Sequence, residues 1–326
     1  MSRSSLAAAL ALAAAVTLAS CSTAPGDEPA AEAAGDTTIS VDVPGQDEPL
    51  VLPEEPERIV ALSPDAAIAL HELGLTDRLV AVPEVALNPT LNAYADEMSD
   101  VPHTLGSGTN PEPEQVASWN PDLVVVTTRH TGEQDASALL RSTGIPVLTL
   151  GNGWSSTDEV AENLALIGAA TGREEEADAL AAEIRDGVAG VRDRGEAAGE
   201  RPTVAILSNQ AHVPFINASD SLASELVTNG GGANVADAVG VRATMPVQPE
   251  QLVAADPDHI MLVDVTGKGE ESFAALLHNP AVAALPAVSE GRVRLFAGRD
   301  VYGLAGRAVV TGSEQVLTWL HPDARE

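Results

Sequence analysis

The chain has few aromatic residues and only one cysteine. Aromatic residues make up 2% of its 326 residues, so a site built from many stacked rings, as would suit a catecholate or a buried porphyrin, is poorly supported. The single cysteine, Cys21, excludes a disulfide within the chain. Apart from one segment at the start, the sequence has no long apolar run, so it predicts no membrane-spanning helix.

Basic residues are also scarce. Lysine and arginine together number 17 against 48 acidic residues, which gives a formal net charge of −31, and Lys268 is the only lysine. Nucleic acid is therefore not an expected partner, because binding to a phosphate backbone depends on clustered basic side chains. The excess of acid does not by itself predict the charge of a ligand.

The one long apolar segment runs from Leu6 to Ala19, follows Arg3 and ends in the sequence Leu-Ala-Ser-Cys. This pattern predicts a signal peptide over residues 1–20, since the segment is shorter than the ~20 residues that a spanning helix needs. The Leu-Ala-Ser-Cys sequence resembles the lipobox of bacterial lipoproteins, which implies that Cys21 becomes the lipid-modified first residue after cleavage. An ordinary secretory signal with a chance cysteine is the alternative. Residues 21–57 are rich in Ala, Pro, Gly, Asp and Glu, which predicts a flexible acidic tether.

A short motif occurs twice. Residues 113–117 read Pro-Glu-Gln-Val-Ala and lead to Pro121-Asp122, and residues 249–253 read Pro-Glu-Gln-Leu-Val and lead to Pro257-Asp258, with the same Glu-to-Asp spacing. Proline at a first helical position, glutamate in the first turn and a Pro-Asp turn before an apolar run are typical of a helix-turn-strand unit. The repeat predicts two similar lobes.

Strand-like and helix-like segments alternate through most of the chain, which predicts an α/β fold with parallel sheets. We expect two doubly wound, Rossmann-like lobes, at residues 58–156 and 199–326, joined by connecting helices at 157–198 that include a single long α-helix. A continuous helix hinges only slightly. The expected ligand site lies between the strand-end loops of the two lobes, since ligands bind beyond the carboxyl ends of parallel strands.

The mature chain resembles the substrate-binding lipoproteins of ABC importers, of the helical-backbone type that handles iron-siderophores, haem and cobalamin. This resemblance implies an extracytoplasmic, lipid-anchored monomer that captures an iron chelate, with a ferric siderophore first in rank, and delivers it to a permease. Haem and cobalamin are alternative ligands, and a sensor or scaffold that delivers no cargo is an alternative class. The resemblance is carried by residues 58–64, 113–122, 230–234, 249–258 and 291–293.

The same resemblance implies that Glu114 and Glu250 meet arginines of the permease. The simpler interpretation is that each carboxylate only complements the positive end of its helix, an effect of up to about 1 kcal/mol. Their symmetric placement in the two copies of the motif favours docking.

Candidate ligand contacts directly follow predicted strands. An arginine could pair with a carboxylate or hydroxamate oxygen of the ligand, and His130 or Tyr302 could coordinate the chelated iron. Each could instead be a loop residue that packs against its neighbours. The candidates are Arg129, His130, Trp154, His212, Phe215, Arg299 and Tyr302, with Arg242 as a further contact from a loop.

An enzyme is the less favoured class. The sequence has no Gly-x-Ser-x-Gly elbow, P-loop or metal-hydrolase histidine pair, and its glycine runs lack the full dinucleotide fingerprint. The run at 230–232 is typical of a helix C-terminal stop. The sequence therefore predicts a binding protein with no catalytic residues and no cofactor of its own.

Overall fold

The computed structural model describes residues 38–106, 111–129, 131–151, 153–210, 213–302 and 305–324. The predictions for Cys21, His130 and His212 lie outside these residues. Within them, no helix combines the length and apolar character required to cross a membrane.

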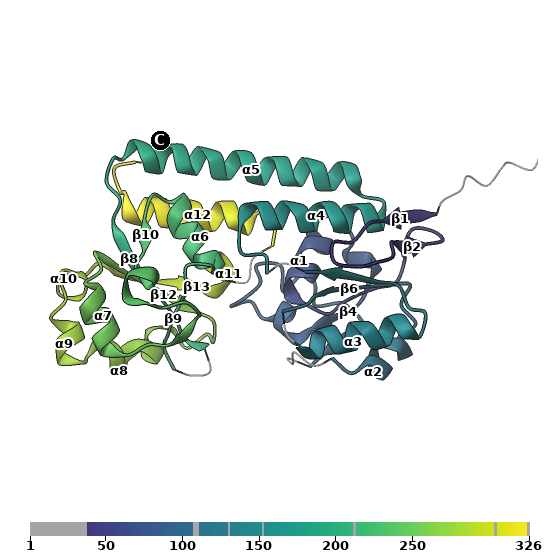
Figure 1. Cartoon of the computed structure of the whole chain (residues 1–326), viewed down its shortest axis with the longest axis horizontal. Helices are drawn as coiled ribbons and strands as arrows, with labels where there is room; N and C mark the ends of the chain where they lie inside the picture. Colours follow the sequence, from purple (N-terminus) through teal and green to yellow (C-terminus); the bar gives the residue numbers. More distant parts are fainter. Residues whose placement is uncertain are drawn as a thin grey trace, which may run out of the picture. The chain divides into compact units, whose positions relative to one another are not determined.

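The N-terminal lobe contains a five-stranded parallel sheet (Figure 1). Its central strands are buried along their whole length, as expected for a parallel sheet covered on both faces. Alternate strand residues pack toward α1 on one face and toward α2 and α3 on the other. In sheet order the strands are β5 (His103–Leu105), β4 (Leu79–Pro83), β3 (Ile59–Ala61), β6 (Leu123–Thr127) and β7 (Val147–Leu150), and the helices are α1 (Pro64–Glu72), α2 (Pro113–Ser118) and α3 (Thr131–Ser142).

The C-terminal lobe is built around a second parallel sheet. Strand β12 (His259–Asp264) lies between β8 (Thr203–Ser208) and β13 (Val293–Ala297), and β10 (Ala233–Asn234) also pairs parallel with β8. An antiparallel edge is formed by β9 (Phe215–Ile216) and β11 (Met245–Pro246). The helices are α6 (Leu222–Asn229), α7 (Pro249–Ala255), α8 (Ala274–Leu277), α9 (Pro280–Ala283), α10 (Pro286–Ser289), α11 (Gly298–Val301) and α12 (Ala308–Leu320).

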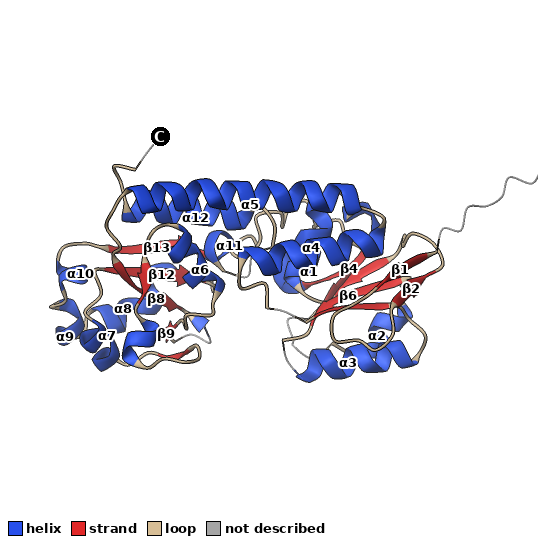
Figure 2. Ribbon diagram, turned by 45° about the horizontal axis from the view of Figure 1, so that its top comes forward, coloured by secondary structure: helices blue, strands red, loops and turns tan. Residues whose placement is uncertain are grey.

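The two lobes are connected by α4 (Thr157–Thr171) and α5 (Glu174–Ala197), which pack against each other (Figure 2). The hydroxyl of Ser156 caps α4, and Gly172 ends it with a positive φ of 65°. The buried residues Leu180, Ile184 and Val188 recur at helical spacing along α5, which explains its unbroken run of 24 residues. The predicted fold class and the long connecting helix are confirmed.

The remaining elements are short. An antiparallel pair, β1 (Ile39–Val41) and β2 (Leu50–Leu52), precedes the N-terminal sheet. The 3-10 helices are η1 (Thr76–Arg78), η2 (Glu84–Leu87), η4 (Ala236–Val239) and η5 (Gly269–Phe273).

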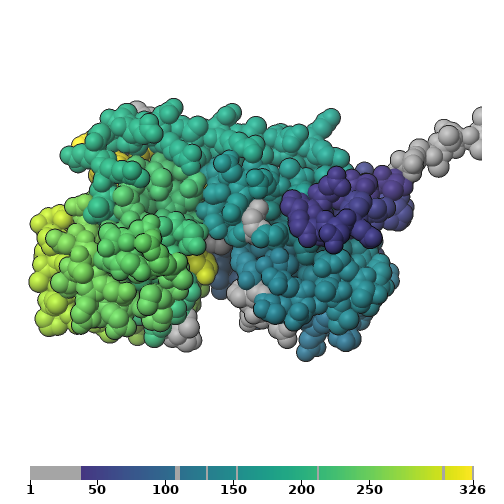
Figure 3. Space-filling model, in the orientation of Figure 1, coloured from purple at the N-terminus to yellow at the C-terminus, as the bar shows by residue number. Residues whose placement is uncertain are grey.

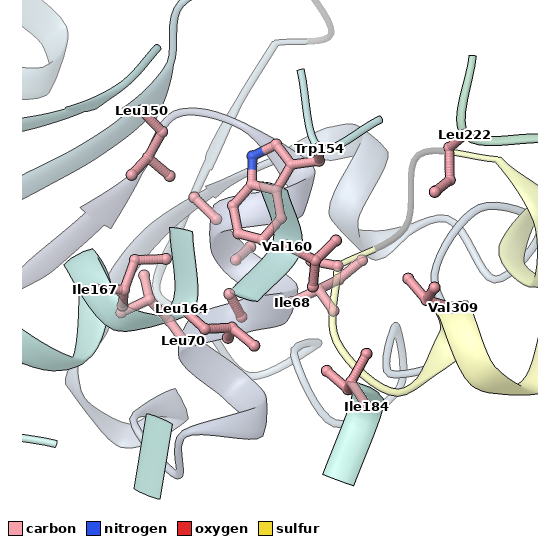
Figure 4. Close-up of a cluster of buried hydrophobic side chains, with 14 of the residues drawn as sticks. Ile68, Leu70, Leu150, Trp154, Val160, Leu164, Ile167, Ile184, Leu222 and Val309 are labelled. Carbon is pink, nitrogen blue, oxygen red and sulfur yellow. The ribbon is translucent and has the colours of Figure 1, made fainter. Parts of the chain in front are cut away.

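One hydrophobic cluster includes residues from both lobes (Figure 4). Ile68 of α1 and Leu164 of α4 belong to it together with Ile184 of α5, Leu222 of α6 and Val309 of α12. Burial of each such side chain stabilises the fold by roughly 1.5–3 kcal/mol. A core shared in this way opposes a large relative movement of the lobes.

The predicted repeat is present in the structure. Helix α2 leads to β6 in the N-terminal sheet, and α7 leads to β12 in the C-terminal sheet, each through a short turn. Asn120 and Asp256, which stand two residues before the aspartate of each copy, both adopt a positive φ, 49° and 39°. The two turns therefore share an uncommon backbone conformation as well as a sequence.

Candidate functional site

A cavity of about 350 Å³ is lined by residues of both lobes. Figure 3 shows the surface hollowed between the green residues of the C-terminal lobe and the blue to teal residues of the N-terminal lobe. The N-terminal side contributes Pro64, Asp65, Arg129, Gly153, Trp154 and Ser155, and the C-terminal side contributes Asn217, Ser221, Leu222, Ala223 and Tyr302.

The position of this cavity distinguishes it from larger hollows. A hollow of about 570 Å³ lies against the ends of α5 and α12, and one of about 840 Å³ lies against β1 and α4. The smaller cavity is lined by residues that follow β6, β7 and β3 at their carboxyl ends. Ligands of parallel α/β sheets bind at this end of the strands, which favours the cavity as the binding site.

An ion pair between Asp65 and Arg129 forms one wall. Proline at the start of α1 places Asp65 in the first helical turn, where its carboxylate also complements the helix end. Its Oδ2 accepts a hydrogen bond of 2.7 Å from Nη1 of Arg129, and Nη2 of Arg129 donates to the carbonyl of Gly153 at 2.9 Å. The carboxylate of Asp65 is 1% exposed and the guanidinium side chain is 32% exposed.

The electrostatics keep Arg129 charged. Burial alone lowers the pKa of Arg129, but the carboxylate of Asp65, aided by that of Glu133, raises the pKa above its ordinary value. Glu133 also accepts the backbone N–H of Arg129 at 2.7 Å, which fixes the loop after β6. The guanidinium is thus neutralised and oriented by groups of the protein itself.

The second carboxylate oxygen of Asp65 is unpaired. Within the described part of the chain, Oδ1 of Asp65 is buried and has no hydrogen-bond partner. A buried polar atom left without a partner costs about 1–3 kcal/mol, and more where it is charged. A residue that lines the cavity therefore has a buried acceptor oxygen without a partner.

Trp154 lines the cavity, but its side chain is almost completely buried. Its side chain is 1% exposed, and its indole N–H donates to Oγ1 of Thr127 at 2.9 Å, which in turn lies 3.1 Å from the hydroxyl of Ser63. Its φ of 58° is uncommon for a bulky residue and costs on the order of 1–3 kcal/mol. Packing and this hydrogen bond hold the ring in place, so it supports the wall and does not offer a free stacking face.

The described residues of the C-terminal wall are partly polar and carry no formal charge. The hydroxyl of Ser221 accepts the N–H of Ser224 at the start of α6, and Asn217 accepts the hydroxyl of Ser208 at 2.8 Å. Burial raises the pKa of the Tyr302 phenol, although Arg129 opposes this, so Tyr302 contributes a neutral hydroxyl. Among the lining residues that the structure describes, only Asp65 and Arg129 are charged, and their charges cancel.

The structure brings together three of the predicted ligand contacts, Arg129, Trp154 and Tyr302. Arg299 lies outside this lining, since its N–H and Nη1 donate to the carbonyls of Thr90 and Pro89 in the N-terminal lobe, at 2.7 and 3.2 Å.

Two further predicted contacts are also absent from the lining. Arg242 is 78% exposed and pairs with Asp237 at 2.9 Å. Phe215 is half-buried in β9.

The lining residues that were not predicted from the sequence include Asp65, Asn217 and Ser221. The Ser-Pro-Asp sequence after a buried strand was visible, but it is equally typical of any helix start. Asn217 and Ser221 carried no signal because their part in the cavity depends on how the lobes pack.

Glu114 and Glu250 are both exposed in the first turns of α2 and α7, and their docking role stays a prediction.

The fold and the cavity define an α/β binding protein with two lobes. The chain belongs to the periplasmic binding protein family, which it matches over residues 59–298. This family consists of binding proteins and not enzymes, in agreement with the class predicted from the sequence.

Relatives of this chain carry related names. A cobalamin-binding protein of Halobacterium salinarum is 32% identical over 239 residues, covering 71% of this chain. The chain spans 60% of the length of that relative. An uncharacterised ABC transporter substrate-binding lipoprotein of Bacillus subtilis, YvrC, is 26% identical over 321 residues, covering 96% of this chain and 95% of the relative.

Solved structures share the fold. The apo form of the periplasmic haem-binding protein RhuT from Roseiflexus sp. RS-1 aligns with a TM-score of 0.69 and 23% identity, covering 82% of this chain and 99% of that chain. At this level of identity the likeness establishes the fold alone.

Proposed function

We propose that this protein is the substrate-binding component of an ABC importer and that its cargo is a cobalamin-type corrinoid. The observation that carries the choice of cargo is the cancelled charge of the cavity, where Asp65 neutralises Arg129. A corrinoid edge carries neutral amide arms. A relative named as a cobalamin-binding protein, at 32% identity, and one named as a vitamin B12-binding protein, at 28% identity, support the same cargo.

The ferric siderophore ranked first from the sequence takes second place to the corrinoid under this proposal. A siderophore would rely on arginines that are free to pair with anionic oxygens of the ligand. Arg129 already pairs with Asp65 and Gly153, and Arg242 and Arg299 bind elsewhere on the protein. An anionic chelate would therefore have to compete with carboxylates of the protein for the same guanidinium.

Haem is a further candidate, because Tyr302 lines the cavity and a phenol can coordinate ferric iron. Two features weigh against haem. Burial raises the pKa of Tyr302, which disfavours the phenolate, and the described lining offers no uncompensated cation for a propionate.

The cavity volume of about 350 Å³ would hold one edge of a corrinoid with its side arms. Delivery would follow docking of the two lobes on the permease through Glu114 and Glu250. Both glutamates are exposed and each occupies the first turn of its copy of the repeat, so arginines of a permease could reach them. Anchoring through Cys21 would keep the protein near the permease at the outer face of the membrane.

Calorimetric titration of the purified protein with cyanocobalamin, haemin and a ferric hydroxamate siderophore tests this proposal. We expect stoichiometric binding of cyanocobalamin at least tenfold tighter than binding of the other two. Tighter binding of haemin or of the siderophore would show that the proposed cargo is wrong. Absence of binding to all three would contradict the proposed transport function.

A further inference from the structure

We propose that Asp65 recognises a neutral N–H donor on the cargo, namely a primary amide of a corrinoid side arm, through its unpaired Oδ1. This inference rests on the proposed function and adds to it the residue that distinguishes an amide from a carboxylate. Asp65 lines the cavity, is 1% exposed, and has one oxygen committed to Arg129 and the other without a partner in the described chain.

The two oxygens of the Asp65 carboxylate have different surroundings. Oδ2 accepts a short hydrogen bond of 2.7 Å from Arg129, so the orientation of the carboxylate is fixed. Oδ1 is buried and has no partner among the described residues, so a ligand donor that reached it would recover the desolvation cost of a buried charged oxygen. The described residues of the lining hold no such donor within hydrogen-bond distance of Oδ1.

The chemistry of the donor follows from charge. The ion pair already balances the site, so a cationic donor would add an uncompensated charge to the cavity and an anionic group would meet the oxygen of Asp65 without a hydrogen to offer. A neutral amide N–H satisfies the acceptor at no electrostatic cost. Discrimination against an analogue that lacks the hydrogen is expected to be large, because it leaves a buried acceptor unpaired and adds a like charge.

The experiment compares cyanocobalamin with its monocarboxylic acids, in which one propionamide has been hydrolysed, on the wild-type protein and on Asp65→Asn. Wild type is expected to bind at least one acid tenfold or more weakly than cyanocobalamin. Asp65→Asn retains an oxygen for Arg129 and presents an NH2 group in place of Oδ1, so it should bind cyanocobalamin at least tenfold more weakly and lose the preference for amide over acid.

The control variant is Asp237→Asn, which removes the same charge from a carboxylate on the surface that pairs with exposed Arg242. It should leave both affinities unchanged. If wild type binds cyanocobalamin but does not discriminate against any of the acids, or if Asp65→Asn binds like Asp237→Asn, the role of Asp65 is overturned while the proposed function stands. If wild type binds no corrinoid, the proposed cargo is overturned and this inference with it. The wild-type comparison decides the matter even if Asp65→Asn fails to fold.

Discussion

Asp122 and Asp258 make equivalent contacts in the two lobes. The carboxylate of Asp122 accepts the N–H groups of Glu57 and Arg58 at 2.9 Å, directly before β3, and that of Asp258 accepts the N–H and hydroxyl of Thr203 at 2.8 and 2.7 Å, at the start of β8. Each aspartate thereby ties the turn before one central strand to the start of the neighbouring strand. The repeated Pro-Asp thus has a structural reason that is independent of any ligand.

Replacing either aspartate should destabilise the protein to a similar extent. An asparagine keeps one acceptor oxygen, so Asp122→Asn and Asp258→Asn should each cost about 1–2 kcal/mol of unfolding free energy, because hydrogen bonds to a charged group are lost. Urea unfolding followed by circular dichroism measures this cost. Asp237→Asn on the surface is the control, and equal midpoints for all three variants would contradict the assigned role.

The lowered pKa of Asp258 predicts that the free energy of unfolding depends on pH in the acid range. Hydrogen bonds from the backbone N–H and hydroxyl of Thr203 lower the pKa of Asp258 below its ordinary value. A lowered carboxyl pKa contributes stability above the unfolded pKa of about 3.9, and this contribution is lost as the pH falls through the folded pKa. Asp258→Asn should therefore flatten the acid limb of a plot of unfolding free energy against pH, and an unchanged limb would contradict this assignment.

A buried carboxylate links the lobes at Gly306. Glu72 of α1 is 1% exposed and accepts the hydroxyl of Tyr94 at 2.7 Å and the N–H of Arg307 at 3.1 Å, while the Arg307 guanidinium binds both oxygens of Glu183 on α5 at 2.8 Å. Gly306 has a φ of 75°, and a Cβ atom there would overlap the carboxylate of Glu72.

Gly306→Ala should consequently destabilise the protein more than Gly74→Ala. Gly74 has nearly the same φ, 76°, and a Cβ atom added there would have nothing within 4 Å, so its alanine variant measures the backbone cost alone, roughly 1–2 kcal/mol. Gly306→Ala should add at least about 1 kcal/mol for the lost contacts of Glu72. Thermal unfolding compares the two, and equal losses would show that the link through Glu72 adds nothing.

Trp154 should report ligand binding. Its indole lies against the cavity wall, whereas Trp119 stacks on His103 and Trp319 packs against Phe296, both away from the lining. A cargo that enters the cavity should change mainly the emission of Trp154. The change should disappear in Trp154→Phe and persist in Trp119→Phe and Trp319→Phe, and a signal that survives in Trp154→Phe would place the cargo elsewhere.

If Glu114 and Glu250 dock on the permease, replacing them should reduce transport of the cargo without changing its binding. Glu114→Arg and Glu250→Arg should reduce uptake of the cargo by cells at least tenfold, because a cation replaces the anion that we propose meets the permease, while cargo affinity of the purified protein stays unchanged. Glu175→Arg, on the exposed first turn of α5, is the matched control. Normal uptake by both lobe variants would leave the glutamates as helix-end charges only.

The sequence predicted the parts of the fold that are encoded locally. Short-range patterns account for the repeated Pro-Glu motif, for the apolar strands and for the stretch without strands that forms α4 and α5. The two-lobed architecture could therefore be predicted from the sequence. The observed helix at 174–197 lies within the predicted 157–198 segment of connecting helices, and its buried residues recur at a single helical period.

The cavity was harder to predict from the sequence because it depends on contacts between residues that are distant in the chain. Arg129 was correctly placed after a strand, yet its pairing with Asp65, 64 positions earlier, cannot be read from either local sequence. From its residue type alone, Trp154 was expected to stack on a ligand. Its left-handed backbone conformation and its hydrogen bond to the hydroxyl of Thr127 instead hold its ring in the core. Arg299 follows the last strand as expected, and the packing of the lobes directs it to the carbonyls of Pro89 and Thr90.

Calorimetric titration of the purified protein with cyanocobalamin and haemin, in parallel, tests the central claim most directly. The described lining has no net charge and includes Asp65 with its unpaired buried oxygen, so we predict saturable binding of cyanocobalamin with one site per chain and at least tenfold weaker binding of haemin. Saturable binding of haemin with no detectable heat from cyanocobalamin would contradict it.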